Sequence, residues 1–223
     1  MTADIQGSPE WHAARLGKVT ASRIADVCAR TKSGWGAGRK NYMAELLVER
    51  LTGRRAEGFT NAAMQHGIDT EPDARSAYQF HINQRIAQVG FVPHGSIADS
   101  GASPDGLVGE DGLVEIKCPN TATHLETLDG APLPEKYFLQ IQWQLACTDR
   151  AWCDFVSFDP RVPEYMSLHV DRVKRDDAAI KATEKCVSDF LGELRDTIDR
   201  LRGKYDPARE PLAPIVALRM EEG

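Results

Sequence analysis

The chain has 223 residues, of which 42% are hydrophobic and 27% are charged, and its formal net charge at pH 7 is −6. This composition is typical of a globular chain that is large enough for one domain with a full core. No apolar run approaches the ~20 residues of a membrane-spanning helix. The polar first eight residues lack the basic-then-apolar order of a signal peptide. We therefore expect a cytoplasmic protein with no membrane association.

The cysteines exclude several kinds of site. There are five, an odd number, and no two of them form a Cys-x-x-Cys pair: Cys28, Cys118, Cys147, Cys153 and Cys186. A disulfide framework, a zinc knuckle and a cysteine-held iron–sulfur cluster all need a tighter arrangement. The histidines also form no zinc-ligand pattern. We interpret the cysteines as reduced thiols in or near the core.

The sequence predicts a series of helices in the N-terminal part of the chain. Ser8 caps a short first helix with Pro9 in its first turn, and Thr20 can cap a second helix through Val27. Residues 33–38 read as a glycine-rich loop. An amphipathic helix follows over 41–51 and ends at Gly53. A further helical stretch covers 61–82, with an interruption near Pro72.

Strands dominate the next part of the chain. The first is expected over 86–92, and the segments 107–109 and 113–118 form a hairpin around a Gly-Glu-Asp-Gly turn. A helix over 135–147, strands over 152–158 and 165–170, and a long charged helix over 176–201 follow. The pattern predicts an α/β (α+β) fold with a central mixed β-sheet flanked by helices. We expect one domain over 1–202 and an irregular tail over 203–223.

A short block in the middle of the chain carries the residue types of metal-assisted hydrolysis. Ser103-Pro104-Asp105-Gly106 is followed, ten residues after Asp105, by Glu115-Ile116-Lys117. Because side chains of a strand alternate between its faces, Glu115 and Lys117 share one face, and the hairpin places Asp105 beside them. Two carboxylates suit Mg²⁺, and the backbone carbonyl of Ile116 is available as a further ligand. Lys117 can then orient water or stabilise charge on a phosphate.

The block alone does not decide between chemistry and ordinary structure. Pro-Asp-Gly is a common turn, and Glu-x-Lys is frequent on solvated strands. Upstream, Glu71 could supply a third carboxylate at a helix break before Pro72. Asp69 and Asp73 compete with it, and both could simply act as charges near a helix N-terminus.

Two glutamines on the helix over 135–147 add support for a site. Gln140 and Gln144 are four residues apart and share a polar strip between two apolar stripes, so the helix should be buried between layers. Buried amides need hydrogen-bond partners. A metal site with waters and phosphate would provide them, and hydrogen bonding within the core is the alternative.

The net charge of −6 at first argues against nucleic acid as a partner. A carboxylate cluster, however, is neutralised by the metal that it binds. Basic residues also group near the N-terminus, at Arg15, Lys18, Arg23, Arg30 and Lys32. We therefore predict weak non-specific DNA affinity with pronounced salt sensitivity.

Several motifs occur in one order along the chain: Arg15-Leu16-Gly17, Thr20-Ala21-Ser22, Gly67 to Glu71, Ser103 to Leu107, Glu115 to Pro119, Gln140-x-Gln142 and Asp159-Pro160-Arg161. In this order they resemble the YqaJ-type viral recombinases, the phage lambda exonuclease family within the PD-(D/E)xK nucleases. The resemblance covers about residues 11–173. It implies a restriction-endonuclease-like core. It also implies a Mg²⁺-dependent exonuclease, with Mn²⁺ as a substitute, that degrades one strand of linear double-stranded DNA from 5′ to 3′ and leaves 3′ overhangs for recombination.

The resemblance also assigns roles to individual residues. It implies that Asp105 and Glu115 hold the metal with help from Glu71, that Lys117 is catalytic and that Gln140 is an active-site amide. Three further residues match the pocket for the substrate's 5′-phosphate: Arg15, Ser22 and Ser103. A guanidinium and two hydroxyls suit a terminal dianion, although a surface arginine, a helix cap and a turn hydroxyl are the ordinary alternatives. Met64 falls where the family places an apolar wedge that unpairs the duplex end, but a methionine at helical spacing also fits a core.

The resemblance further implies a homotrimer ring around double-stranded DNA ends and a single-strand annealing protein as partner, in a bacterial or phage-infected cell. Two alternatives stay open. One is a structure-specific or Cas4-like nuclease, for which the cysteines offer no cluster ligands. The other is a catalytically silent DNA-binding subunit, which the intact Asp105, Glu115 and Lys117 disfavour. The glycine-rich 33–38 segment and the 203–223 tail have no counterpart in the family.

Overall fold

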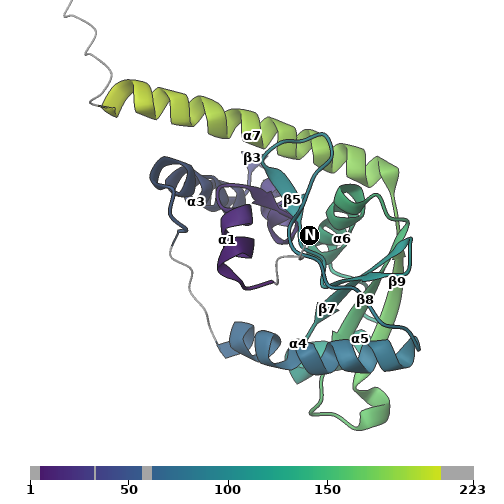
Figure 1. Cartoon of the computed structure of the whole chain (residues 1–223). Helices are drawn as coiled ribbons and strands as arrows, with labels where there is room; N and C mark the ends of the chain where they lie inside the picture. Colours follow the sequence, from purple (N-terminus) through teal and green to yellow (C-terminus); the bar gives the residue numbers. More distant parts are fainter. Residues whose placement is uncertain (1–5, 33, 57–61, 207–223) are drawn as a thin grey trace, which may run out of the picture.

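The computed structural model describes residues 6–32, 34–56 and 62–206, which form helices around two main β-sheets (Figure 1). The helices are α1 (Pro9–Arg15), α2 (Ile24–Cys28), α3 (Ala37–Thr52), α4 (Ala62–His81), α5 (Thr121–Leu128), α6 (Glu135–Thr148) and α7 (Asp177–Tyr205). The strands are β1 (Val19–Thr20), β2 (Arg30–Thr31), β3 (Gly34–Trp35), β4 (Val92–Pro93), β5 (Ser100–Ala102), β6 (Gly106–Val108), β7 (Gly112–Lys117), β8 (Trp152–Phe158) and β9 (Leu168–Lys174).

The larger sheet has the strand order β6-β7-β8-β9 and is mixed. β6 and β7 form an antiparallel hairpin with Gly106 opposite Val114, whereas β7 and β8 run parallel. A parallel pair needs a crossover connection, and the segment that carries α5 and α6 provides it. Gly112 lies against the Trp152 ring so closely that an added Cβ would come within 2.2 Å of it. A side chain at this position would therefore push the two strands apart.

Two helices cover the two faces of this sheet, and the alternation of β7 decides which residues they meet. Val114 and Ile116 pack with Ala74 and Tyr78 of α4. Leu113 packs instead with Ile141 and Leu145 of α6, together with Phe155 of β8. Glu115 and Lys117 share the face of Leu113 because side chains two residues apart point the same way. The predicted central mixed sheet flanked by helices is confirmed.

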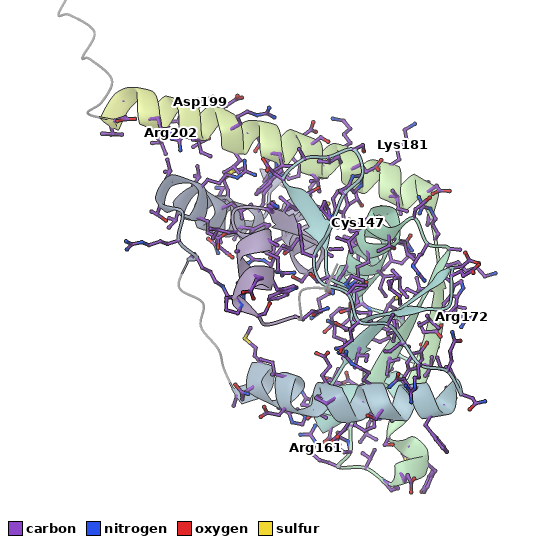
Figure 2. The ribbon with its side chains drawn as sticks, in the orientation of Figure 1. Cys147, Arg161, Arg172, Lys181, Asp199 and Arg202 are labelled. Carbon is purple, nitrogen blue, oxygen red and sulfur yellow. The ribbon has the colours of Figure 1, made fainter. Side chains whose placement is uncertain are left out.

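A second core lies beside the smaller sheet, whose strand order is β1-β5-β4. Side chains from α2, α3, α6 and α7 meet there, including Ile24, Leu46, Trp143 and Phe190. α6 thus contributes to both cores, which confirms its predicted burial between layers. α7 spans 29 residues and lies along this core (Figure 1). Lys181 and Asp199 project from its outer side (Figure 2).

Most elements agree with the sequence-based expectations. The Ser8 hydroxyl accepts a hydrogen bond from the Trp11 amide and caps α1, with Pro9 as its first residue. α3 ends at Gly53, which adopts a left-handed conformation with φ 66°. The β6–β7 hairpin, α6 and β8 lie where the sequence predicted them. All five cysteines are free thiols, as expected.

The chain between α4 and β5 corrects the strand predicted over 86–92. Ala87 forms only an isolated bridge to Leu107 of the larger sheet, whereas Val92 pairs with Ala102 of the smaller one. The segment crosses from one sheet to the other, so it pairs briefly with each. The strand predicted over 165–170 also differs, because 164–166 is a 3₁₀ turn and β9 begins at Leu168. Pairing of Leu168 with Phe158 sets that start.

Two predictions near the N-terminus need correction, and one helix later in the chain was not predicted. Thr20 lies in β1 and makes no side-chain cap, and a 3₁₀ turn precedes α2. The predicted 33–38 loop holds the short strand β3 and the start of α3, although Ser33 itself lies outside the described residues. α5 was not predicted, although Asn120 caps it by accepting a hydrogen bond from the Thr123 amide.

The interruption predicted at Pro72 is wrong, because α4 continues through it. Proline removes the hydrogen bond to the carbonyl four residues earlier, which belongs to Ile68, an exposed residue. Water can satisfy that carbonyl, while buried Ala74 and Tyr78 hold the next turns on the sheet. Glu71 therefore lies in mid-helix.

At the C-terminal end of the chain, α7 extends to Tyr205, past the predicted end at 201. The rest of the predicted tail, 207–223, lies outside the described residues. No helix among the residues described here is both long and apolar enough to cross a membrane.

Candidate active site

The carboxylate block lies where the chain passes from the smaller sheet to the larger one. β5 ends at Ala102 and β6 begins at Gly106, so Ser103 and Asp105 lie in the junction. The pairing of Gly106 with Val114 places Asp105 opposite Glu115 at the next step of the hairpin. The structure brings the three predicted side chains together, because Asp105, Glu115 and Lys117 line one cavity of about 150 Å³.

Glu115 is held from three sides. Its side chain is almost fully buried. Gln140 Nε2 donates to Oε1 at 2.6 Å, and Gln144 Nε2 donates to Oε2 at 2.5 Å. Lys117 Nζ forms an ion pair with the same carboxylate. Both glutamine side chains therefore hydrogen-bond a carboxylate that lines the cavity, and their role in catalysis stays a prediction. The amide oxygen of Gln144, Oε1, is buried and has no hydrogen-bond partner among the described residues.

Asp105 is positioned by the strand opposite, because the backbone amide of Ile116 donates to its Oδ2 at 2.7 Å. Burial and the negative charge of Glu115 raise the pKa of Asp105 well above its ordinary value, although Lys117 opposes this. Burial lowers the pKa of Lys117, but Glu115 and Asp105 outweigh it and raise the pKa overall. The cavity thus holds two carboxylates with a single ammonium between them. The Ile116 side chain points into the core on the other face, and its carbonyl stays a predicted ligand.

The three predicted phosphate-binding residues line the same cavity. β1 and β5 are parallel, with Thr20 beside Gly101. The carboxyl ends of parallel strands lie at one edge of a sheet. Ser22 comes after β1 and Ser103 comes after β5, so both serines lie near that edge. Arg15, the last residue of α1, donates from Nη1 to Ser103 Oγ at 3.1 Å. Burial lowers the pKa of Arg15 to about 10, so its guanidinium is still charged at neutral pH.

A second and larger cavity continues from this one. It has a volume of about 340 Å³ and shares Trp11, Arg15 and Ser22 with the first. Other basic side chains that line it are His12, Lys18, Arg23 and Arg55. Three residues of the predicted N-terminal basic group thus line this cavity, together with Glu45 and Glu49, and Arg23 is paired with Glu45.

Two predicted residues lie at the margin of the site. Glu71 comes from α4, pairs with Arg75 and does not line the carboxylate cavity, although its charge helps to raise the pKa of Asp105. Its role as a metal ligand stays a prediction. Met64 is 54% exposed and lines the larger cavity, so it is not a core residue. Its role as a wedge also stays a prediction.

The sequence interpretation missed Trp11, which lines both cavities. Its Nε1 donates to Ser103 Oγ at 2.9 Å, and the Arg15 guanidinium lies 4.1 Å from its ring centroid. The spacing of Trp11 and Arg15, four residues apart on one helix, was the available signal. Gln6 was missed as well; it reaches the cavity while its Nε2 donates to the Pro104 carbonyl at 2.8 Å.

The donor set fits a hard divalent cation. Asp105 and Glu115 are carboxylates that line one cavity, and oxygen ligands of this kind suit Mg²⁺, which keeps several waters. Across the described ranges, no group of three or more His, Cys, Asp and Glu side chains is close enough to hold a metal. The site therefore offers two carboxylates, the number that suffices when water and a substrate phosphate complete the shell.

The chain belongs to the YqaJ-like viral recombinase family, since the model of that domain matches residues 10–151. Its structure is similar to that of LHK-Exo, an alkaline exonuclease from Laribacter hongkongensis. The two chains are 52% identical, and the superposition has a TM-score of 0.83 and covers 91% of this chain and 100% of the other. A structure of LHK-Exo in complex with dAMP matches equally well.

Two other proteins extend the comparison. A phage-related exonuclease from Haemophilus somnus 129PT shares the fold, with 16% identity, a TM-score of 0.64 and coverage of 82% of this chain and 96% of the other. The uncharacterised protein R354 of Acanthamoeba polyphaga mimivirus is 28% identical over 208 residues. That match covers 87% of this chain but 36% of R354, so the chain spans about a third of the length of this relative.

Proposed function

We propose that this protein is a metal-dependent exonuclease that degrades linear double-stranded DNA from its 5′ ends and leaves 3′ overhangs. One observation carries the proposal: a single cavity holds both a carboxylate–lysine group and an arginine with two hydroxyls. The first group suits hydrolysis of a phosphodiester, and the second suits a terminal phosphate. An enzyme that binds an end beside the bond it cuts acts as an exonuclease. The similarity to an alkaline exonuclease also supports the proposed exonuclease activity.

Asp105 and Glu115 would hold Mg²⁺, for which Mn²⁺ can substitute. When bound, the metal supplies Lewis-acid polarisation of the phosphate and a more acidic water. The chain's own residues prepare the site. Gln140 and Gln144 fix the orientation of Glu115, and Lys117 stays protonated and donates hydrogen bonds to the water or to a phosphate oxygen. Arg15 and the two serines hold the end of the strand.

The hydrolytic half of the proposal is tested with linear and covalently closed circular duplexes. Linear DNA should be degraded only when Mg²⁺ or Mn²⁺ is present. Lys117→Ala should lower the rate by at least ~10²-fold while DNA binding persists. Lys136→Ala is the matched control, because Lys136 contacts the same Tyr137 ring from an exposed position outside the cavity. Cleavage of closed circles as fast as of linear ends would instead indicate an endonuclease.

The end-binding half is tested with duplexes that carry a 5′-phosphate or a 5′-hydroxyl, labelled at either end. Wild type should prefer the 5′-phosphate and release 5′ label first. Arg15→Ala should reduce this preference by roughly 10- to 100-fold, the worth of a hydrogen bond to a charged group. Arg202→Ala, on the exposed surface of α7 (Figure 2), is the control. Equal wild-type rates on both kinds of end would refute the pocket assignment.

Family membership supports two further parts of the proposal. The protein would form a homotrimer ring around the duplex in the cytoplasm of a bacterial or phage-infected cell. It would pass its 3′ overhangs to a single-strand annealing protein for recombination. Light scattering should give three times the mass of the chain, and a monomer at all concentrations would contradict the ring.

A further inference from the structure

Ser103 receives two hydrogen bonds at one oxygen atom. Trp11 Nε1 lies 2.9 Å and Arg15 Nη1 lies 3.1 Å from Ser103 Oγ. Indole and guanidinium nitrogens are donors only, so the serine oxygen must accept both bonds. A hydroxyl has two acceptor lone pairs and one hydrogen. Both acceptor positions of Ser103 are therefore filled, and its hydrogen is left to point elsewhere.

The remaining hydrogen of Ser103 has no acceptor among the residues that the structure describes. In the part of the chain that the structure describes, Ser103 forms no hydrogen bond as a donor. The residue lines the cavity that also contains Asp105 and Lys117. A hydroxyl whose lone pairs are occupied presents only a donor to a ligand in that cavity, and the ligand must supply an acceptor oxygen.

Trp11 holds both Ser103 and Arg15 in place, the first through its indole N–H and the second through the face of its ring. The backbone amide of Trp11 is bonded to the Ser8 cap, which anchors the first turn of α1. Its indole N–H holds Ser103, and its ring face carries the Arg15 guanidinium at 4.1 Å from the centroid. The same side chain thus orients the two groups that face the ligand. Stacking leaves the in-plane N–H groups of the guanidinium accessible, so those that do not bond Ser103 can donate to a phosphate.

We propose that Trp11 is a positioning residue that makes Ser103 a hydrogen-bond donor to the terminal 5′-phosphate. This inference rests on the proposed function of the cavity and adds the origin of its selectivity. A phosphate monoester presents three acceptor oxygens and no obligatory donor. A pocket of donors alone therefore favours it over a 5′-hydroxyl end, which carries one oxygen with its own hydrogen. Without the indole N–H, Ser103 can turn its hydrogen away and present a lone pair to the phosphate.

The test is a double-mutant cycle on Trp11 and Ser103. Trp11→Phe keeps an aromatic face for Arg15 but removes the N–H, and Ser103→Ala removes the hydroxyl. The measured quantity is the ratio of kcat/KM for duplexes with a 5′-phosphate and with a 5′-hydroxyl. Each single variant should lower this ratio by roughly tenfold, which corresponds to one hydrogen bond. The double variant should be no worse than Ser103→Ala alone, because Trp11 acts through the serine.

The controls separate this inference from the function on which it rests. Trp35→Phe changes another tryptophan that stacks on arginines, at Arg30 and Arg39, and should leave the ratio unchanged. Thermal unfolding of each variant shows that it is folded. A wild-type ratio near one would refute the phosphate pocket as a whole. A high wild-type ratio that Trp11→Phe leaves unchanged would refute only the role of Trp11, as would single effects that multiply in the double variant.

Discussion

Replacing Asp105 by Asn is expected to stabilise the metal-free protein while it abolishes nuclease activity. Asp105 and Glu115 line one cavity, and Lys117 supplies a single positive charge for both. Burial and the charge of Glu115 raise the pKa of Asp105, which expresses the energetic cost of a second carboxylate there. The two carboxylates are thus arranged for a cation, and their proximity lowers the stability of the metal-free protein.

The size of the effect follows from what Asn keeps and removes. The amide oxygen of Asn can still accept the hydrogen bond from Ile116, which reaches Asp105 at 2.7 Å. Only the charge is lost. A buried polar group without full compensation costs about 1–3 kcal/mol, which is a lower bound for a charged one, and each kcal/mol moves the unfolding midpoint of a chain of this size by ~2–4 °C. In EDTA, the variant should therefore unfold roughly 2–12 °C above wild type.

Calorimetry in EDTA and across a Mg²⁺ titration checks this expectation. Mg²⁺ should raise the midpoint of wild type, because a ligand that binds the folded state stabilises it, and it should raise that of Asp105→Asn far less. Asp111→Asn, at the exposed turn of the β6–β7 hairpin, is the matched control and should follow wild type. The reasoning fails if Asp105→Asn unfolds below wild type in EDTA, or if Mg²⁺ stabilises both proteins equally.

Three further predictions concern the stability of the fold and the residues that support the site. Asp154 is buried and accepts two hydrogen bonds from Arg172, at 2.8 and 2.9 Å. Arg172→Met should therefore lower the free energy of unfolding, measured in urea, by about 1–3 kcal/mol, and an unchanged urea midpoint would contradict this. Burial by itself would raise the pKa of Asp159, but hydrogen bonds from Arg161 and a threonine hydroxyl lower it to about 2. The ion pair of Asp159 with Arg161 stabilises the fold fully above the ordinary Asp pKa of about 4 and loses this effect as the pH falls through about 2. The urea midpoints of wild type and Arg161→Met should therefore converge in acid. A difference between the midpoints that does not change with pH would refute the role of this ion pair. Gln144→Leu removes one of two amides that hold the buried glutamate, and it should lower kcat or metal affinity by roughly 10- to 100-fold; wild-type Mg²⁺ dependence would count against this role.

The local chemistry of the site could be predicted from the sequence because it depends on short-range periodicity. Alternation along β7 puts Glu115 and Lys117 on one face, and the hairpin brings Asp105 opposite them. The spacing of Gln140 and Gln144 places both amides on one side of α6. In each case the positions are set by residues that are close in sequence, so the geometry of one element suffices.

The phosphate-binding half could be named only from the family resemblance, since its parts are far apart in the sequence. Arg15 and Ser103 are joined by a contact across 88 positions, and Trp11, which orients both, carried no signal of its own beyond helical spacing. The errors in the predicted helices and strands also arise from contacts between residues that are far apart in the sequence. α4 tolerates Pro72 because Ala74 and Tyr78 pack on the sheet, and the 86–92 segment has little strand because it crosses between two sheets.

The sequence by itself determined the carboxylate–lysine group, the helix between two cores and the family, because periodicity and motif spacing act over a few residues. Only the tertiary structure decided that β1 and β5 end at one edge, so that two distant serines face the same cavity as the carboxylates. It also decided that Glu71, on the helix across the sheet, lies outside the lining of that cavity. Which face of a sheet a helix covers depends on packing over the whole chain, and no local pattern encodes it.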